Sequence, residues 1–144
     1  RLIGGKTDVI MMLNGALAGL VAITAEPLTP SPLAAIFIGA IGAIIMYFGT
    51  KMLEGFGLDD VVGAIPVHMF AGIFGTLIVP ATNSETSFGT QFVGILSVVL
   101  FSFVLSYAVF VALKATIGLR VSKEAERLGT DKAEIGVQAY AIRD

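Results

Sequence analysis

The apolar positions along the chain form four long stretches, followed by a polar tail. The stretches cover about residues 8–25, 33–53, 61–79 and 92–118, and charged or proline-rich segments separate them. A helix needs ~17–25 apolar residues to span a bilayer, so the first stretch is short for a span and the fourth is long enough to tilt. The strands of a membrane barrel alternate apolar and polar residues, whereas these runs are continuous. The pattern therefore predicts an all-α fold, a polytopic membrane helical bundle.

Composition indicates the same class. Of the 144 residues, 56% are hydrophobic and 14% are charged, which is more apolar surface than a soluble domain of this size can bury. The net charge of −2 gives no basis for nucleic-acid binding, and the lack of cysteine excludes disulfide and thiol chemistry. The chain begins with Arg1 and has no signal-peptide pattern, so we expect it to be the C-terminal part of a longer protein.

The basic residues indicate an orientation in the membrane. Four spans place the loops at 26–32 and 80–90 on one side, and neither loop contains Lys or Arg. All nine basic residues lie on, or at the span end nearest, the other side: Arg1, Lys6, Lys51, Lys114, Arg120, Lys123, Arg127, Lys132 and Arg143. The positive-inside rule then places both ends of the chain in the cytoplasm. We expect residues 1–120 to belong to a multi-pass cell-membrane domain and residues 121–144 to form a cytoplasmic tail.

Glycines recur in pairs within three of the spans. The pairs are Gly15 with Gly19, Gly39 with Gly42, and Gly72 with Gly75. Small residues allow helix backbones to approach closely in lipid, so the repetition predicts a dense bundle.

His68 is the one histidine of the chain and lies within the uncharged run 61–79. At ~1.5 Å of rise per residue it is about 12 Å inward from Asp60, near the middle of a bilayer. An ionisable group at that depth is a candidate functional residue that should stay neutral and face protein or a pore. The alternative is a neutral imidazole that only hydrogen-bonds between helices.

The residues around His68 refine this expectation. At helical spacing, Ala64, Gly72 and Gly75 share its face, which predicts a small, smooth stripe suited to a narrow passage or a close neighbour. Pro66 lacks a backbone donor, so it can kink the helix and free a carbonyl, although proline kinks are also ordinary in membrane helices.

Two further regions carry polar candidates. Asn14, in the first span, either hydrogen-bonds between helices or contacts a substrate. In the tail, Ser122 is placed to cap a helix that runs through Arg127 and ends at Gly129. Asp131 with Glu134 predicts a capping-box start for a second turn. No nucleophile–base pair, metal-ligand set or phosphate loop accompanies them, so we expect no enzyme activity, no metal and no cofactor.

Several motifs resemble segments of the ammonium transporter (Amt/Mep/Rh) family. The run Asn14-Gly15-Ala16-Leu17-Ala18-Gly19-Leu20-Val21 resembles the eighth transmembrane helix of that family. Asp59-Asp60, followed by Val67-His68 and Gly72, resembles its tenth helix. Gly118-Leu119-Arg120-Val121 resembles the junction of the eleventh helix with the tail, and Asp131 with Ala139-Tyr140 resembles the family's ending. The likeness covers essentially the whole chain.

The resemblance implies a function and an assembly. The chain would be the last four helices and the tail of an eleven-helix, inverted-repeat transporter that assembles as a homotrimer in the lipid bilayer. Each subunit would have a hydrophobic pore lined by two histidines, of which His68 matches the second. Asn14 and Leu17 would line the cytoplasmic half of that pore, and Asp59 and Asp60 would lie at a helix start on the cytoplasmic face.

In such a pore ammonium would give up its proton and cross as ammonia, while potassium, which has no proton to give up, would be rejected. The resemblance also suggests a PII-type signal protein as a partner of the tail. The chain departs from the family at Gly63, where a second carboxylate is common, and at Ile135, where a histidine is common. Two other functions stay open: an ammonium-sensing membrane module that controls a signalling partner, and a non-transporting structural subunit.

Overall fold

The computed structural model describes residues 7–139, and every regular element in that range is helical, as predicted. The chain forms two compact units, Arg1–Val98 and Val99–Asp144, which are described separately. The elements are α1 (Val9–Thr24), α2 (Pro32–Gly55), the π-helical turn η1 (Ile65–Phe70), α3 (Ala71–Ile78), the 3-10 turn η2 (Val79–Ala81), α4 (Phe88–Thr116), α5 (Lys123–Leu128) and the π-helical turn η3 (Asp131–Ile135).

The helix ends differ from the expected ranges where side chains cap them. The third helical segment begins at Ile65 and not near residue 61, for reasons given with the candidate site. Helix α4 begins at Phe88 and not near residue 92 because the Ser87 hydroxyl accepts from the backbone N–H of Thr90 at 3.2 Å. It ends at Thr116 because Gly118 adopts a left-handed conformation, φ +82°, and its N–H turns back to the Leu113 carbonyl.

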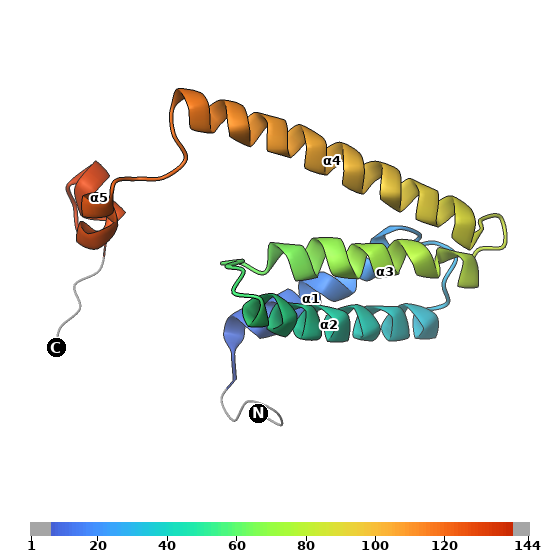
Figure 1. Ribbon diagram of the computed structural model, residues 1–144. Helices are drawn as coiled ribbons and strands as arrows, with labels where there is room; N and C mark the ends of the chain where they lie inside the picture. The colour runs from blue at the N-terminus through green and yellow to red at the C-terminus, as the bar shows by residue number, and fades with distance from the viewer. Residues whose placement is uncertain (1–6, 140–144) are drawn as a thin grey trace. The chain divides into compact units, whose positions relative to one another are not determined.

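Helices α1, α2 and α3 lie side by side in the first unit (Figure 1). Helices α1 and α2 meet through their glycines: a Cβ added to Gly19 would lie 3.2 Å from the Gly39 carbonyl oxygen. A Cβ on Gly42 would lie 2.9 Å from the Ala18 carbonyl oxygen. The backbones therefore approach as closely as the glycine pairs predict.

The third helical segment, formed by η1 and α3, packs against both α1 and α2. Around it lies a small core formed by Ala18, Met46, Val67 and Ala71, each no more than 2% exposed. Gly75 of α3 lies directly against the backbone of Ala22 in α1, and a Cβ there would overlap the Ala22 carbonyl. The glycines of α2 and Gly75 of α3 thus allow each of these two helices to pack closely against α1.

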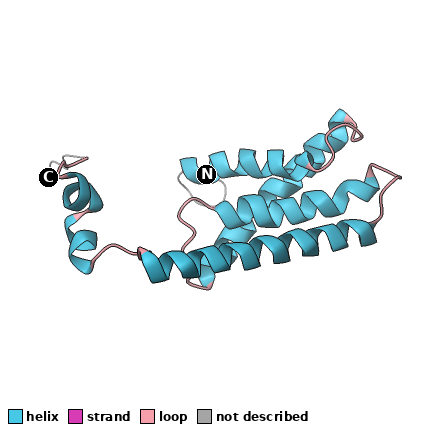
Figure 2. Cartoon of the chain, turned by 90° about the horizontal axis from the view of Figure 1, so that it is seen from above, coloured by secondary structure: helices cyan, strands magenta, loops and turns pink. Residues whose placement is uncertain are grey.

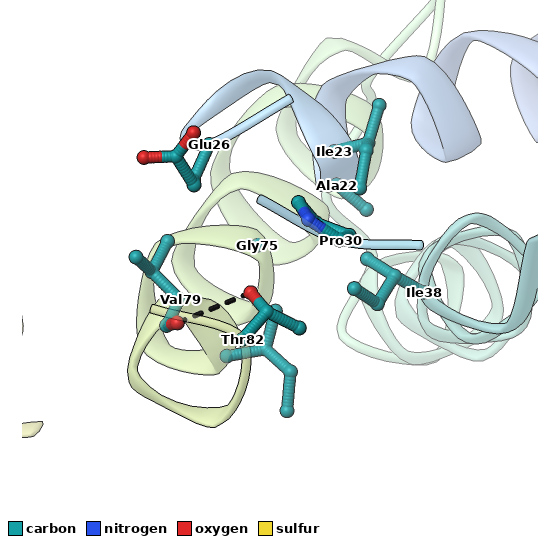
Figure 3. Close-up of a pocket in the computed structure, with 9 residues that line it drawn as sticks. Ala22, Ile23, Glu26, Pro30, Ile38, Gly75, Val79 and Thr82 are labelled. Atoms are coloured by element: carbon teal, nitrogen blue, oxygen red, sulfur yellow. Dashed lines mark hydrogen bonds between the residues drawn. The ribbon is translucent and has the colours of Figure 1, made fainter. Parts of the chain in front are cut away.

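Loops at one end of this bundle are joined through Glu26. One carboxylate oxygen accepts from the Leu28 N–H at 3.1 Å, and the other accepts from the Asn83 side-chain amide at 3.2 Å. Beside it, Pro30, Val79 and Thr82 help to line a small pocket, in which the Thr82 hydroxyl donates to the Val79 carbonyl (Figure 3). The free volume of about 10 Å³ matches a single water.

Two helices, α2 and α4, are long and apolar enough to cross a membrane. Helix α1 and the segment Ile65–Ala81 are apolar but shorter. Many large apolar side chains of these helices are exposed, for example Phe37 at 61% and Phe101 at 69%. Such surfaces suit contact with lipid or with further helices, and they are foreign to the surface of a soluble domain.

In the second unit, the tail after α4 forms two short turns (Figure 2). Ser122 caps α5 by accepting from the Ala125 N–H at 3.1 Å, and Gly129, φ +95°, follows its last residue, as predicted. Arg120 forms an ion pair with Glu126 at 2.8 Å.

The predicted capping box at Asp131 is wrong. The turn η3 is π-helical, its N-cap is Thr130, and no side chain caps it. The Asp131 carboxylate instead accepts from the Ala139 N–H at 2.8 Å, eight residues ahead. This bond closes the tail on itself, because the π turn and the left-handed Gly136 return the chain toward Asp131.

Candidate functional site

The site begins where the chain enters the third helical segment. Asp60 accepts from two successive backbone N–H groups, that of Ala64 at 2.9 Å and that of Ile65 at 2.7 Å. Between Asp60 and these two residues the chain turns at Gly63, whose φ of +72° is the left-handed conformation that glycine adopts without strain. Residues 61–63 therefore form a turn and not the first helical turn expected from their apolar character, and the Asp60 carboxylate bonds to the backbone just after this turn.

Asn14 connects helix α1 to this turn. Its side-chain amide donates to the Val62 carbonyl at 2.9 Å. A Cβ on Gly63 would lie only 2.5 Å from the Asn14 amide nitrogen, so a larger residue there would have to displace the Asn14 amide. The bond between separate segments that the sequence suggested for Asn14 is thus present, and its acceptor is a backbone carbonyl. Whether Asn14 also lines a pore stays a prediction.

His68 lies within η1, a π-helical turn that continues into α3. Its register is shown by the Ala71 N–H, which donates to the Pro66 carbonyl five residues back. Turns of this kind are rare in proteins and often occur at functional sites.

Packing against α2 sets the face that His68 occupies. Phe70 lies directly against Gly49 of α2, and a Cβ on Gly49 would be 3.4 Å from the Pro66 ring. Pro66 and Phe70 are four residues apart, so both face α2, while His68, two residues from each, lies on the opposite side of the turn. Val67 is 2% exposed and belongs to the core, whereas His68 is exposed.

The residues of the predicted stripe, Ala64, His68, Gly72 and Gly75, have different surroundings. Gly75 is buried against Ala22, a close neighbour, whereas Ala64 and His68 are exposed. Gly72 is partly exposed, and a Cβ there would be in ordinary contact with Val21, 3.6 Å away.

The remaining candidates lie at different places. Leu17 is 48% exposed and lies on α1 between Asn14 and Val21, which contact the start and the middle of the third segment. Asp59 is exposed, and its side chain makes no hydrogen bond within residues 7–139. Gly118 and Arg120 lie in the second unit, at the end of α4 and in the ion pair with Glu126.

Tyr140, one of the residues that carry the resemblance in the tail, lies outside the described residues, as do three of the basic residues used for orientation: Arg1, Lys6 and Arg143.

Three residues of the site are not predicted as functional by the sequence pattern. Gly49 belongs to no glycine pair, Gly63 stands out only as a departure from a family pattern, and nothing local marks the Val62 carbonyl as the acceptor of Asn14. For Gly49 no local signal distinguishes it from other glycines, since its role depends on Phe70 of another helix.

In chemical terms the site offers one imidazole on an exposed face of an apolar segment, and its ring nitrogens make no hydrogen bond within residues 7–139. An imidazole both donates and accepts a proton. No group of three His, Asp or Glu residues that could hold a metal ion occurs in the described part of the chain. These features define a class: a polytopic helical membrane protein with a histidine on an exposed face of an apolar helical segment.

The chain belongs to the ammonium transporter family. The model of the Ammonium Transporter Family matches residues 1–140. The ammonium transporter Amt2 of Archaeoglobus fulgidus is 41% identical, over 94% of this chain and 33% of its own length. An Amt2 of Methanocaldococcus jannaschii is 34% identical over 96% of the chain and 35% of its own length, and an ammonium transporter of Aquifex aeolicus is 33% identical over 96% and 36%. The chain thus spans about a third of these relatives, whose names are those of transporters and not of enzymes.

Proposed function

We propose that the protein carrying this chain transports ammonium across the cell membrane through a pore to which His68 contributes. The observation that carries the proposal is the placement of His68. It is an exposed ionisable residue of a π turn, and its neighbours Pro66, Val67 and Phe70 are packed against other helices. Family membership supports ammonium as the substrate.

The mechanism follows from the cost of charge in an apolar passage. A bare cation in such a passage loses its hydration without compensation. Ammonium can leave its proton behind and cross as ammonia, hydrogen-bonded to the ring nitrogens of neutral imidazoles, and be protonated again on the other side. Potassium has no proton to give up and is excluded. We propose that His68 is one of two facing histidines, and that Asn14 and Leu17 lie toward the cytoplasmic half of the pore.

The assembly is also part of the proposal. Residues 1–120 belong to the membrane domain and residues 121–144 to a cytoplasmic tail, with both ends of the chain in the cytoplasm, supported by the one-sided distribution of Lys and Arg. Asp59 and Asp60 then lie at the cytoplasmic face. A homotrimer, and a PII-type signal protein as a partner of the tail, rest on family membership alone.

The test of transport uses the longest reading frame that contains this chain, expressed in cells that lack ammonium uptake. We expect growth on low ammonium to be restored. Protein present in the membrane without restored growth would contradict transport, and would favour a sensing module or a structural subunit.

For His68 itself, we expect His68→Ala to change the ammonium conductance or the selectivity for ammonium over potassium, because the passage loses a group that accepts and donates hydrogen bonds. Met69→Ala is the matched control, since Met69 lies in the same turn and is also exposed, at 45%. Electrical and uptake recordings on reconstituted protein measure both quantities. Unchanged conductance and selectivity in His68→Ala would sink the role of His68.

A further inference from the structure

We infer that Gly49 of α2 is a positioning residue for His68, because the absence of a side chain there lets the π turn η1 pack directly on α2. The inference rests on the proposed function, since the placement of His68 affects transport only if His68 lines the path. Gly49 is buried and lies on a different helix from His68, so it would act on the substrate only through the turn.

Two side chains of the turn pack on Gly49. A Cβ at Gly49 would overlap the ring of Phe70, whose Cε2 atom would be 2.9 Å away, and would lie 3.4 Å from the Cβ of Pro66. Pro66 is less than 2% exposed, and its ring is rigid, so it cannot move aside by changing its rotamer. An alanine at position 49 would therefore displace the Phe70 ring or force the turn away from α2.

One backbone donor links these contacts to His68. The Ala71 N–H donates both to the Pro66 carbonyl, five residues back, and to the His68 carbonyl, three residues back. Pro66 and Phe70 face α2, so His68, two residues from each, lies on the opposite side of the turn. A displacement of Pro66 from α2 therefore disturbs the bonds that hold the backbone at His68, and it moves the imidazole on the face that the proposed path follows.

Gly42, two turns earlier in α2, has different neighbours. A Cβ at Gly42 would lie 2.6 Å from the Cβ of Ala22 and 2.9 Å from the Ala18 carbonyl oxygen, both in α1. Both glycines allow close packing, but the contacts of Gly42 are with α1 and those of Gly49 are with the turn that contains His68. Gly42→Ala is therefore a matched control, because it disturbs the packing of α2 at a place away from that turn.

A double-mutant cycle tests the role of the contact. Gly49→Ala adds a methyl group, and Phe70→Leu removes the ring that this methyl group would overlap. If Gly49 acts through Phe70 and the turn, the effect of Gly49→Ala should be largely relieved when residue 70 is leucine. The effect of Gly42→Ala should be the same in both backgrounds, because its methyl group meets α1.

The experiment uses the longest reading frame that contains the chain, reconstituted into liposomes. A misplacement of about 1 Å can lower the rate of a positioned reaction about 100-fold, so we expect Gly49→Ala to lower ammonium transport or its selectivity over potassium at least about tenfold. In the Phe70→Leu background the same substitution should change them by less than about twofold. Gly42→Ala should lower the amount of folded protein and leave the selectivity of the folded molecules unchanged. Unchanged transport and selectivity in folded Gly49→Ala protein, or an equal loss in both backgrounds, would overturn the inference.

A second measurement does not depend on transport. Amide hydrogen exchange of residues 67–71 should be faster in Gly49→Ala, return toward the unsubstituted rate in the double variant, and stay unchanged in Gly42→Ala. Phe70→Trp crowds the same contact from the side of the turn, and it replaces Gly49→Ala if that variant yields too little folded protein. Exchange that is no faster in the crowded variant than in the unsubstituted protein would contradict the role of Gly49. If the unsubstituted protein does not transport ammonium, the proposed function fails, while the exchange measurements still decide whether Gly49 holds the turn.

Discussion

Ala22 shows how single residues set the packing of the first unit. It lies between two glycines of different helices, Gly42 of α2 and Gly75 of α3. A Cβ on Gly42 would lie 2.6 Å from the Ala22 Cβ, and one on Gly75 would overlap the Ala22 carbonyl. In a soluble helix each glycine would cost about 1 kcal/mol relative to alanine, so here the close approach of three backbones offsets that cost.

This contact predicts different effects of the same substitution at two glycines of α3. Gly75→Ala forces a methyl group against the Ala22 backbone, which cannot move aside like a flexible side chain, and should destabilise the protein by about 1–3 kcal/mol. Gly72→Ala places its methyl in ordinary contact with Val21 and should be close to neutral. Thermal unfolding of the two variants in the same detergent compares them directly. Equal melting temperatures would show that α3 does not pack on α1 in this way.

Residue types predicted some of these roles and not others. Glycine pairs and a lone histidine are visible in the sequence, and so is the Asp60 position that caps a helix. The contact of Gly49 with Phe70 and the choice of Val62 as the acceptor of Asn14 depend on residues 21 and 48 positions apart. Local periodicity contains no information about such pairs, because they arise only when separate helices pack.

At the scale of elements, the sequence predicted four apolar helical segments, but it did not predict the form of the third segment or of the second turn of the tail. The third segment begins with a turn and a π-helical stretch, because Asp60, Gly63 and Pro66 together replace the ordinary first turn of a helix. The tail contains a second π turn, η3, where a capping box was expected. In both cases a carboxylate bonds to more distant backbone groups than an α-helical cap would reach.

The bond that closes the tail should depend on pH. The backbone N–H groups of Ala139 and then of Lys132 stabilise the carboxylate of Asp131 and hold its pKa below the ordinary value. A lowered pKa in the folded state means that the contribution to tail stability is present above about pH 3.9, the usual pKa of Asp, and is lost as the pH falls through the lowered value.

We therefore expect the amide signal of Ala139 to follow the protonation of Asp131 as the pH falls below about 3.9, the ordinary pKa of Asp. In Asp131→Asn this titration should disappear. Glu134→Gln serves as the control, because the Glu134 side chain makes no hydrogen bond within residues 7–139. Nuclear magnetic resonance of the labelled protein in detergent measures the shift. An Ala139 signal that titrates identically in Asp131→Asn would show that another group is responsible.

At the scale of the whole molecule, the sequence contains more information about the orientation in the membrane than about the assembly of the protein. The distribution of Lys and Arg indicates which ends of the helices share a side, because translocation leaves basic residues in the cytoplasm. The faces that meet the rest of the protein carry no comparable signal: large exposed apolar residues serve contact with lipid and with further helices equally well. The chain spans about a third of its relatives, so the second histidine of the proposed pore lies outside it.

The proposed orientation can be tested by cysteine labelling. The chain contains no cysteine, so a single introduced cysteine reports on one position. Ser84→Cys lies in the loop between η2 and α4, which contains no basic residue, and Glu124→Cys lies in α5 of the tail. In intact cells that express the longest reading frame, with any cysteine outside this chain replaced, a membrane-impermeant maleimide should label Ser84→Cys and leave Glu124→Cys unlabelled. After the membrane is opened, both should react, which controls for accessibility. Labelling of Glu124→Cys in intact cells would contradict the proposed orientation.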